Sequence, residues 1–117
     1  MMTKLSIEHR YQKLVEKLLF KSAEKVTLID LTQLNAEADV FLIATANSDV
    51  HMRTLLNVVE ETLDAEGTSY VVEGRNSSLW GLIDTGKLVV HIFSKRGRDF
   101  YRIESIWGDA PTTVFAD

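Results

Sequence analysis

The sequence predicts a single-domain α/β protein in which a mixed β-sheet is flanked by helices. A chain of 117 residues with 45% hydrophobic and 26% charged residues suits one compact domain. Segments with helical apolar spacing alternate with short runs rich in β-branched residues. One run, DVFLIATA, is apolar on both alternating faces, as is typical of a strand covered on two sides. The predicted order of elements is α-β-β-α-β-β-β-α.

The first half of the chain is expected to contain a helix and two strands. Apolar residues recur at helical spacing from Ile7 to Leu19 with charged residues between them, which predicts a helix at about residues 4–23. KVTLIDL, residues 25–31, is short and rich in β-branched residues, so it is expected to be a strand. DVFLIATA, residues 39–46, is the second predicted strand.

A second amphipathic helix is expected after that strand. Asn47 and Ser48 offer side-chain caps for its first turn, and Gly67 supplies its C-terminal stop. The strand–helix–strand order at this point favours a parallel crossover. The last three strands are expected to form an antiparallel meander, at residues 69–73, 79–84 and 87–93.

The end of the chain is interpreted from its glycines and its proline. Gly97 is expected to break the chain before a short helix over residues 98–107, which ends at Gly108. The residues after Pro111 are interpreted as a tail. Residues 1–117 then form one domain, without internal repeats or linkers.

The composition excludes several classes of site. Cysteine is absent, which excludes disulfides, thiolate metal ligands and cysteine nucleophiles. No apolar run reaches the roughly 20 residues that span a bilayer, so we expect a cytoplasmic protein with no membrane partner. A formal net charge of -4 argues against sequence-independent nucleic-acid binding, and we expect little direct nucleic-acid contact.

Three histidines are the first candidates for chemistry. His9 lies among the charged residues of the first helix and is expected to be solvated. His51 falls in the first turn of the middle helix, where it could meet an anion, although a cap-region role is favoured. His91 shares a strand face with Val89 and Phe93, and we expect a buried, neutral and hydrogen-bonded imidazole.

Neither catalysis nor a metal is well supported by the sequence. It contains no His-x-x-x-His pair that would suggest a zinc site. The acid-x-acid pairs Glu37/Asp39 and Asp64/Glu66 lack an accompanying phosphate loop, because the strand-to-helix turn ATANSD has no glycine. We therefore predict that the protein is not an enzyme and uses no cofactor.

Basic and aromatic residues in the second half suggest a surface that binds a protein. The segment SKRGR places positive charge close to Tyr101. Trp80 lies just after a polar turn, and tryptophan, tyrosine and arginine are the residue types that anchor protein interfaces. Trp80 also alternates in phase with Leu82, so the sequence leaves both an interface role and a core role open.

Several motifs, taken in order, resemble the ribosome silencing factor family, also called Iojap-related. The resemblance runs through ADVFLIATANSDVHMRTL and VEGRNSSLWGLIDTGKLVVHIFSKRGRDFYRIESIWGDAP, and it covers about residues 26–111. Its most specific members are Val72-Glu73-Gly74, Trp80 with Asp84 and Gly86, Val90-His91, Arg98, Tyr101, Glu104 and Trp107.

The resemblance implies a nucleotidyltransferase-like mixed sheet without catalytic activity, in a protein that represses translation. Proteins that look like this bind the large ribosomal subunit through the ribosomal protein numbered fourteen. They thereby block joining of the small subunit, especially under nutrient limitation, and homodimers are expected when they are free. An acidic protein suits a basic ribosomal protein as a partner, because opposite charges steer their encounter.

By position, the resemblance assigns partner contacts to Trp80, Asp84 and Tyr101, and more weakly to Arg98. The two aromatic residues would act as packing anchors, and the carboxylate of Asp84 would accept hydrogen bonds.

Two positions depart from the family pattern TGTS-x-RHV, because Ala46 stands for a glycine and Val50 for an arginine. Two other functions also remain open at this point. The fold that the resemblance implies is shared with nucleotidyltransferase-related enzymes, and fold alone does not decide function. A self-associating adaptor without a ribosomal partner is the other alternative.

Overall fold

The computed structural model describes residues 10–34, 36–102, 108 and 110–115. Its elements are, in chain order, α2 (Gln12–Phe20), β1 (Glu24–Asp30), β2 (Val40–Ala46), α3 (Asp49–Ala65), β3 (Val71–Glu73), β4 (Trp80–Asp84), β5 (Leu88–Ser94), α4 (Lys95–Tyr101) and β6 (Thr112–Val114). The strands form one sheet in the order β3-β4-β5-β2-β1-β6. β2 and β5 are parallel and the other neighbouring pairs are antiparallel, so the sheet is mixed, as predicted.

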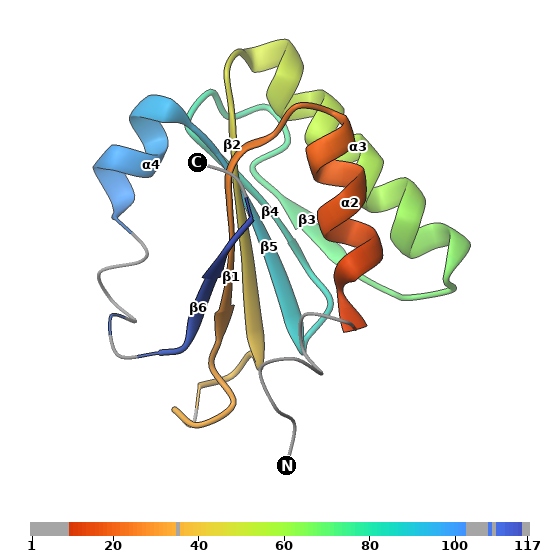
Figure 1. Cartoon of the computed structure of the whole chain (residues 1–117). Helices are drawn as coiled ribbons and strands as arrows, with labels where there is room; N and C mark the ends of the chain where they lie inside the picture. The colour runs from red at the N-terminus through yellow and green to blue at the C-terminus, as the bar shows by residue number, and fades with distance from the viewer. Residues whose placement is uncertain (1–9, 35, 103–107, 109, 116–117) are drawn as a thin grey trace.

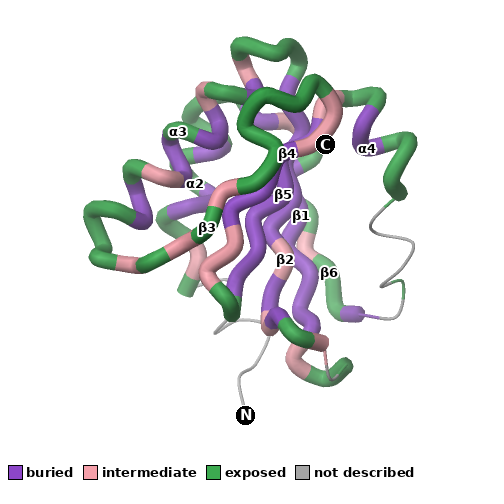
Figure 2. The backbone as a smooth tube through the Cα atoms, turned by 180° about the vertical axis from the view of Figure 1, so that it is seen from behind, coloured by how far each residue is buried: buried purple, intermediate pink, exposed green. Residues whose placement is uncertain are grey.

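The described helices lie on both sides of this sheet. Figure 1 shows α2 and α3 next to each other on one face, while α4 leaves the end of β5 on the other side. Figure 2, seen from behind, shows the buried residues concentrated along the central strands and along the sides of α2 and α3 that meet the sheet. The prediction of a single α/β domain is confirmed.

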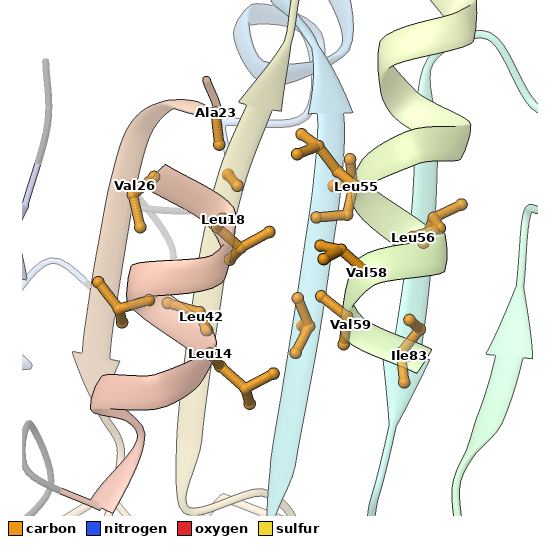
Figure 3. Packing of buried hydrophobic residues seen from close by; sticks show 14 of the residues in the cluster. Leu14, Leu18, Ala23, Val26, Leu42, Leu55, Leu56, Val58, Val59 and Ile83 are labelled. Carbon is orange, nitrogen blue, oxygen red and sulfur yellow. The ribbon is translucent and has the colours of Figure 1, made fainter. Parts of the chain in front are cut away.

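The main hydrophobic core lies between the sheet and the two helices α2 and α3. Figure 3 shows side chains of both helices pointing towards those of the strands. In β5, Leu88, Val90 and Ile92 belong to this layer, whereas Val89 and Phe93 belong to clusters on the opposite face. Alternate residues of β5 therefore lie on opposite faces of the sheet, as the alternation in the sequence predicted.

The ends of α3 are determined locally, as the sequence indicated. Ser48 has extended backbone angles, and its hydroxyl accepts a hydrogen bond from the backbone N–H of His51 at 3.0 Å. After Ala65 the chain turns through Gly67, whose φ is +72°, a conformation that costs glycine little. The N–H of Thr68 then bonds back to the carbonyl of Leu63 at 3.0 Å, which closes the helix end.

The central crossover and the final meander follow the prediction with one addition. β3, β4 and β5 are joined as an antiparallel meander. β3 runs in the same direction as β2, as a crossover requires, but it does not pair with β2. The strand that pairs with β2 is β5, with His91 opposite Ile43. The meander therefore places its last strand next to β2 and its first strand, β3, at the edge of the sheet.

The prediction for the last helix was wrong at its start. α4 begins at Lys95, directly after β5, because the hydroxyl of Ser94 accepts from the N–H of Gly97 at 2.9 Å and caps the helix. Gly97 lies inside the helix, where a Cβ would collide with the carbonyl oxygen of Leu79. α4 ends at Tyr101, and residues 103–107 of the predicted helix lie outside the described residues.

The interpretation of the C-terminus as a tail was also wrong. β6 pairs antiparallel with β1, placing Thr112 opposite Ile29 and Val114 opposite Thr27. The Pro111 carbonyl accepts from the N–H of Asp30 at 2.9 Å, just before the strand. A segment of three residues is too short for its sequence pattern to indicate a strand. β6 forms by pairing with the backbone N–H and C=O groups that the edge of β1 would otherwise leave unpaired.

The first helix is shorter at its C-terminal end than predicted. α2 ends at Phe20, and Ser22 then has a φ of +65°, which no helix continues through. The part of the prediction over residues 4–9 falls outside the described residues. Across residues 10–34, 36–102, 108 and 110–115, no helix combines the length and the apolar character needed to cross a membrane.

Candidate functional site

An aromatic cluster lies on the sheet face opposite α2 and α3. Trp80 of β4 lies against His91 and Phe93 of β5 with nearly parallel ring planes and centroids 5.9 and 6.2 Å apart, and it meets Tyr101 of α4 at 5.6 Å. We call Trp80, His91, Phe93 and Tyr101 the aromatic cluster. Phe93 is buried, Trp80 is half-buried and Tyr101 is 42% exposed. Trp80 therefore packs on the sheet through one side while keeping accessible surface on the other.

His91 holds Trp80 in place by a hydrogen bond. The indole Nε1–H of Trp80 donates to Nδ1 of His91 at 3.0 Å. The imidazole is 5% exposed, and burial lowers the pKa of His91 from 6.5 to about 4, while the charge of Asp84 opposes this shift to a lesser extent. The prediction of a buried, neutral and hydrogen-bonded histidine is confirmed. With Nδ1 as acceptor, Nε2 carries the proton, and it has no hydrogen-bond partner among the described residues.

A groove of about 660 Å³ opens beside the aromatic cluster. Its lining combines β4, β5, the turn between them, the start of β2 and the segment before it, and consists of Ala36, Glu37, Ala38, Phe41, Trp80, Leu82, Asp84, Gly86, Val89 and His91. Asp84 lies on the same strand face as Trp80, because residues four apart in a strand point to the same side. One carboxylate oxygen of Asp84 accepts from the N–H of Gly86 at 2.7 Å, which orients the side chain at the β4–β5 turn.

Arg98, the fourth predicted contact residue, points into the protein. It is 8% exposed, and its guanidinium donates to the Lys25 carbonyl at 2.7 Å, to the Thr45 hydroxyl at 2.9 Å and to the Thr27 hydroxyl at 3.0 Å. These acceptors belong to β1 and β2, so Arg98 joins α4 to the middle of the sheet. This geometry gives Arg98 a structural role, in place of the direct partner contact that the sequence suggested.

His51 likewise has a structural environment. Its Nδ1 accepts from the N–H of Asn47 at 2.9 Å, so Nε2 carries the proton and donates to the Lys21 carbonyl at 2.7 Å. Both ring nitrogens are therefore occupied: Nδ1 within the start of α3 and Nε2 across to the end of α2, and no ring donor is left for an anion. Within the described part of the chain, no group of three or more histidine, aspartate or glutamate side chains is arranged to hold a metal.

The family is shown by comparison with known proteins. The family model described as "Ribosomal silencing factor during starvation" matches residues 4–117. The chain belongs to this family. It is 36% identical over 92 residues to the ribosomal silencing factor RsfS of Bacillus subtilis (strain 168), covering 78% of each chain. It is also 36% identical over 100 residues to the Iojap-related mitochondrial protein of Arabidopsis thaliana, covering 80% of this chain and 54% of that one.

Solved structures agree with this assignment. A crystal structure of a Chromobacterium violaceum protein superposes with a TM-score of 0.80 at 28% identity, covering 93% of this chain and 92% of that one. A second, from Bacillus halodurans, gives a TM-score of 0.77 at 29% identity, covering 91% and 97% of the two chains. The resemblance drawn from the motifs is thus confirmed for the family, and the expected mixed sheet flanked by helices is confirmed for the fold.

The two departures from the RsfS pattern have different structural settings. Ala46 ends β2 in an ordinary strand conformation and is 1% exposed within the core, so this position does not require the conformational freedom of glycine. Val50 is 65% exposed on the first turn of α3. Val50 therefore presents an apolar side chain to the surface where the family pattern has a positively charged arginine.

Sequence reasoning missed several residues that lie beside the aromatic cluster and the groove. Phe100 is 73% exposed and packs edge-on against Tyr101, with centroids 5.0 Å apart. The only feature of the sequence that could have indicated this role for Phe100 was its position next to Tyr101 in a predicted short helix. Glu37 and Phe41 reach the groove from the segment around the start of β2, and no local pattern indicates that they lie near Trp80.

Proposed function

We propose that this protein represses translation by binding the large ribosomal subunit through the ribosomal protein numbered fourteen. By occupying the face on which the small subunit docks, it blocks joining of the two subunits, especially under nutrient limitation. Membership of the ribosomal silencing factor family supports a ribosome-associated role, and the descriptions of its relatives name regulators rather than enzymes. We further propose that the free protein is a homodimer, as the resemblance implies.

The observation that carries the proposal is the accessible aromatic pair formed by Trp80 and Tyr101, with centroids 5.6 Å apart. Both rings rest on the buried ring of Phe93, so they are held in place before any partner arrives. Rigid aromatic side chains lose little conformational entropy on binding, which makes them effective anchors of protein interfaces. Asp84 on the same face of β4 adds an acceptor for a basic partner.

A steric mechanism fits this arrangement. Blocking a docking face requires affinity and correct placement, and it requires no turnover. The protein carries a formal net charge of -4, which favours encounter with a basic ribosomal protein.

The test is co-sedimentation of the pure protein with separated ribosomal subunits, followed by a subunit-joining assay in sucrose gradients. We expect the protein to migrate with the large subunit and to reduce the yield of joined ribosomes. Tyr101→Ala should weaken binding by about 2 kcal/mol, or roughly 30-fold, since it removes an exposed anchor at a helix end. Trp80→Ala should weaken it at least as much.

Phe20→Ala is the matched control. Phe20 is 81% exposed at the end of α2, on the helix-covered side of the sheet, so its removal deletes a similar ring away from the proposed site. The control should bind like the wild type. Absence of the wild-type protein from the large-subunit fraction would refute the proposal, and magnesium-dependent nucleotide transfer by the pure protein would favour the enzymatic alternative.

A further inference from the structure

The groove beside the aromatic cluster carries negative charge without an internal counter-charge. Of its lining residues, Asp84 and Glu37 are acids, none is lysine or arginine, and His91 is neutral near pH 7. Neither carboxylate forms a salt bridge within the described residues. Asp84 uses one oxygen to accept from Gly86, which leaves its second oxygen for another donor.

The remaining lining is apolar and aromatic. Leu82 and Val89 lie on the strands β4 and β5, and the rings of Phe41 and Trp80 pack against them. Such a surface suits a hydrocarbon chain, whereas the carboxylates at Asp84 and Glu37 suit a positive head group. A purely apolar occupant would desolvate the carboxylates without replacing their hydrogen bonds, which costs free energy.

A lysine or arginine side chain matches both the apolar lining and the two carboxylates of the groove. Its methylene stem can lie along apolar surface while the charged end reaches carboxylates. The face of a tryptophan ring also attracts a cation within about 6 Å of its centroid. A nucleic-acid backbone is disfavoured as the occupant, because its phosphates would be repelled by the two acids.

We propose that this groove receives one lysine or arginine side chain of the protein partner on the ribosome. The inference rests on the proposed function and specifies the chemistry of the partner residue. Glu37, which lies outside the residues that the family motifs indicate, becomes part of the recognition surface. The aromatic cluster then provides the hydrophobic anchors, and the groove provides the charge selectivity next to them.

The test measures binding of charge variants to large ribosomal subunits by sedimentation at low and at high salt. Asp84→Asn keeps an oxygen for the Gly86 N–H but removes the charge, and Glu37→Lys reverses a charge on an exposed residue. We expect each to lower affinity about tenfold or more at low salt and to reduce the salt dependence of binding. The control Glu61→Lys makes the same reversal on an exposed position of α3 and should stay within about twofold of the wild type.

The outcomes separate this inference from the proposed function. If the wild type binds and Glu37→Lys binds equally well or more tightly, the groove does not receive a cation and the inference fails, while ribosome binding stands. Loss of affinity in Asp84→Asn alone would also refute it, because that result indicates a lost hydrogen-bond acceptor and no cation in the groove. If the wild type itself does not bind, the proposed function fails first. Thermal unfolding of each variant checks that the fold is retained.

Discussion

The indole N–H of Trp80 donates a 3.0 Å hydrogen bond to Nδ1 of His91 on the neighbouring strand, and the planes of the two rings lie within 13° of parallel. This pair links an accessible aromatic residue to a buried one. It fixes the orientation of Trp80 on the surface, and it assigns the imidazole proton to Nε2. A histidine that first looked like a candidate for catalysis therefore positions a partly exposed tryptophan.

The Trp80–His91 hydrogen bond should be measurable as a coupling energy. Trp80→Phe keeps a ring for stacking but removes the donor, so it leaves the buried Nδ1 unpaired and should lower the free energy of unfolding by about 1–3 kcal/mol. In a double-mutant cycle with His91→Phe, we expect a coupling of about 1 kcal/mol. Urea unfolding of the four proteins measures it, and additive effects would show that the bond contributes nothing.

Protonation of His91 should destabilise the fold at low pH. Burial lowers its pKa from 6.5 to about 4, so between these values the unfolded chain binds a proton that the folded chain does not. The stabilising contribution is complete above pH 6.5 and is lost progressively as the pH falls towards 4. The shift corresponds to about 3 kcal/mol.

The check on this pH dependence is a comparison with His91→Asn, whose side-chain oxygen can still accept from Trp80 but does not titrate. Unfolding free energies at about pH 7 and about pH 4.5 should differ more for the wild type than for this variant. The two proteins differ at this one side chain, so the pH effects of all other groups cancel in the comparison. Equal losses in the two proteins would contradict the assignment.

Removing the guanidinium of Arg98 should cost stability without directly affecting binding. Arg98→Met leaves the Thr27 and Thr45 hydroxyls and the Lys25 carbonyl without this donor, and we expect a loss of about 3 kcal/mol in the free energy of unfolding. Arg98→Lys should recover part of it, because an ammonium group has three donors but lacks the planar fork. Variants that remain folded should still bind large subunits, and a folded Arg98→Lys protein that fails to bind would restore the contact role.

Two glycine substitutions should differ strongly in effect. A Cβ at Gly97 would collide with the Leu79 carbonyl, so Gly97→Ala must push α4 away from the turn before β4 and should cost more than about 2 kcal/mol. A Cβ at Gly67 meets nothing within 4 Å. Gly67→Ala should therefore lower the free energy of unfolding by only about 1 kcal/mol, which is the cost of placing alanine at a positive φ. Thermal unfolding of both variants gives the comparison, and equal costs would show that α4 does not need this close approach.

Deleting the residues after Pro111 should destabilise the sheet. β6 covers the edge of β1, and Phe115 packs against the main core while its N–H bonds to the Val26 carbonyl at 2.8 Å. We expect a lower unfolding free energy by about 2 kcal/mol or more, from lost apolar burial and an uncovered edge. Phe115→Ala in the full-length chain separates the two contributions. A truncated protein as stable as the wild type would return these residues to the status of a tail.

The features that the sequence predicted well depend on neighbouring residues along the chain. Ser48 caps α3 through an N–H three residues away, and Gly67 ends it through a local backbone conformation. The alternation in β5 assigned His91, Val89 and Phe93 to one face for the same reason. α4 was placed late because Gly97 was interpreted as a break, whereas the Ser94 cap and the contact with Leu79 explain that glycine.

The candidate site depends mostly on contacts between distant segments. Arg98 looked like an exposed cation of a basic segment, but its acceptors lie 53 to 73 residues earlier in the chain. Glu37 lines the same groove as Asp84 only because the segment before β2 meets the β4–β5 turn, where the N–H of Asp39 bonds to the Lys87 carbonyl. No periodicity in the chain records such proximity.

The fold class, the mixed sheet, the ends of α3 and the family could all be predicted before the structure was known, because local propensity, strand alternation and ordered motifs depend on residues that are neighbours along the chain. Tertiary structure alone decided that β6 completes the sheet, that Arg98 faces inward, and that Trp80 is held by His91 beside an acidic groove. Those outcomes depend on which strand edge is open, which acceptors are buried and which side chains meet across the sheet. Such relations exist only once the chain has folded.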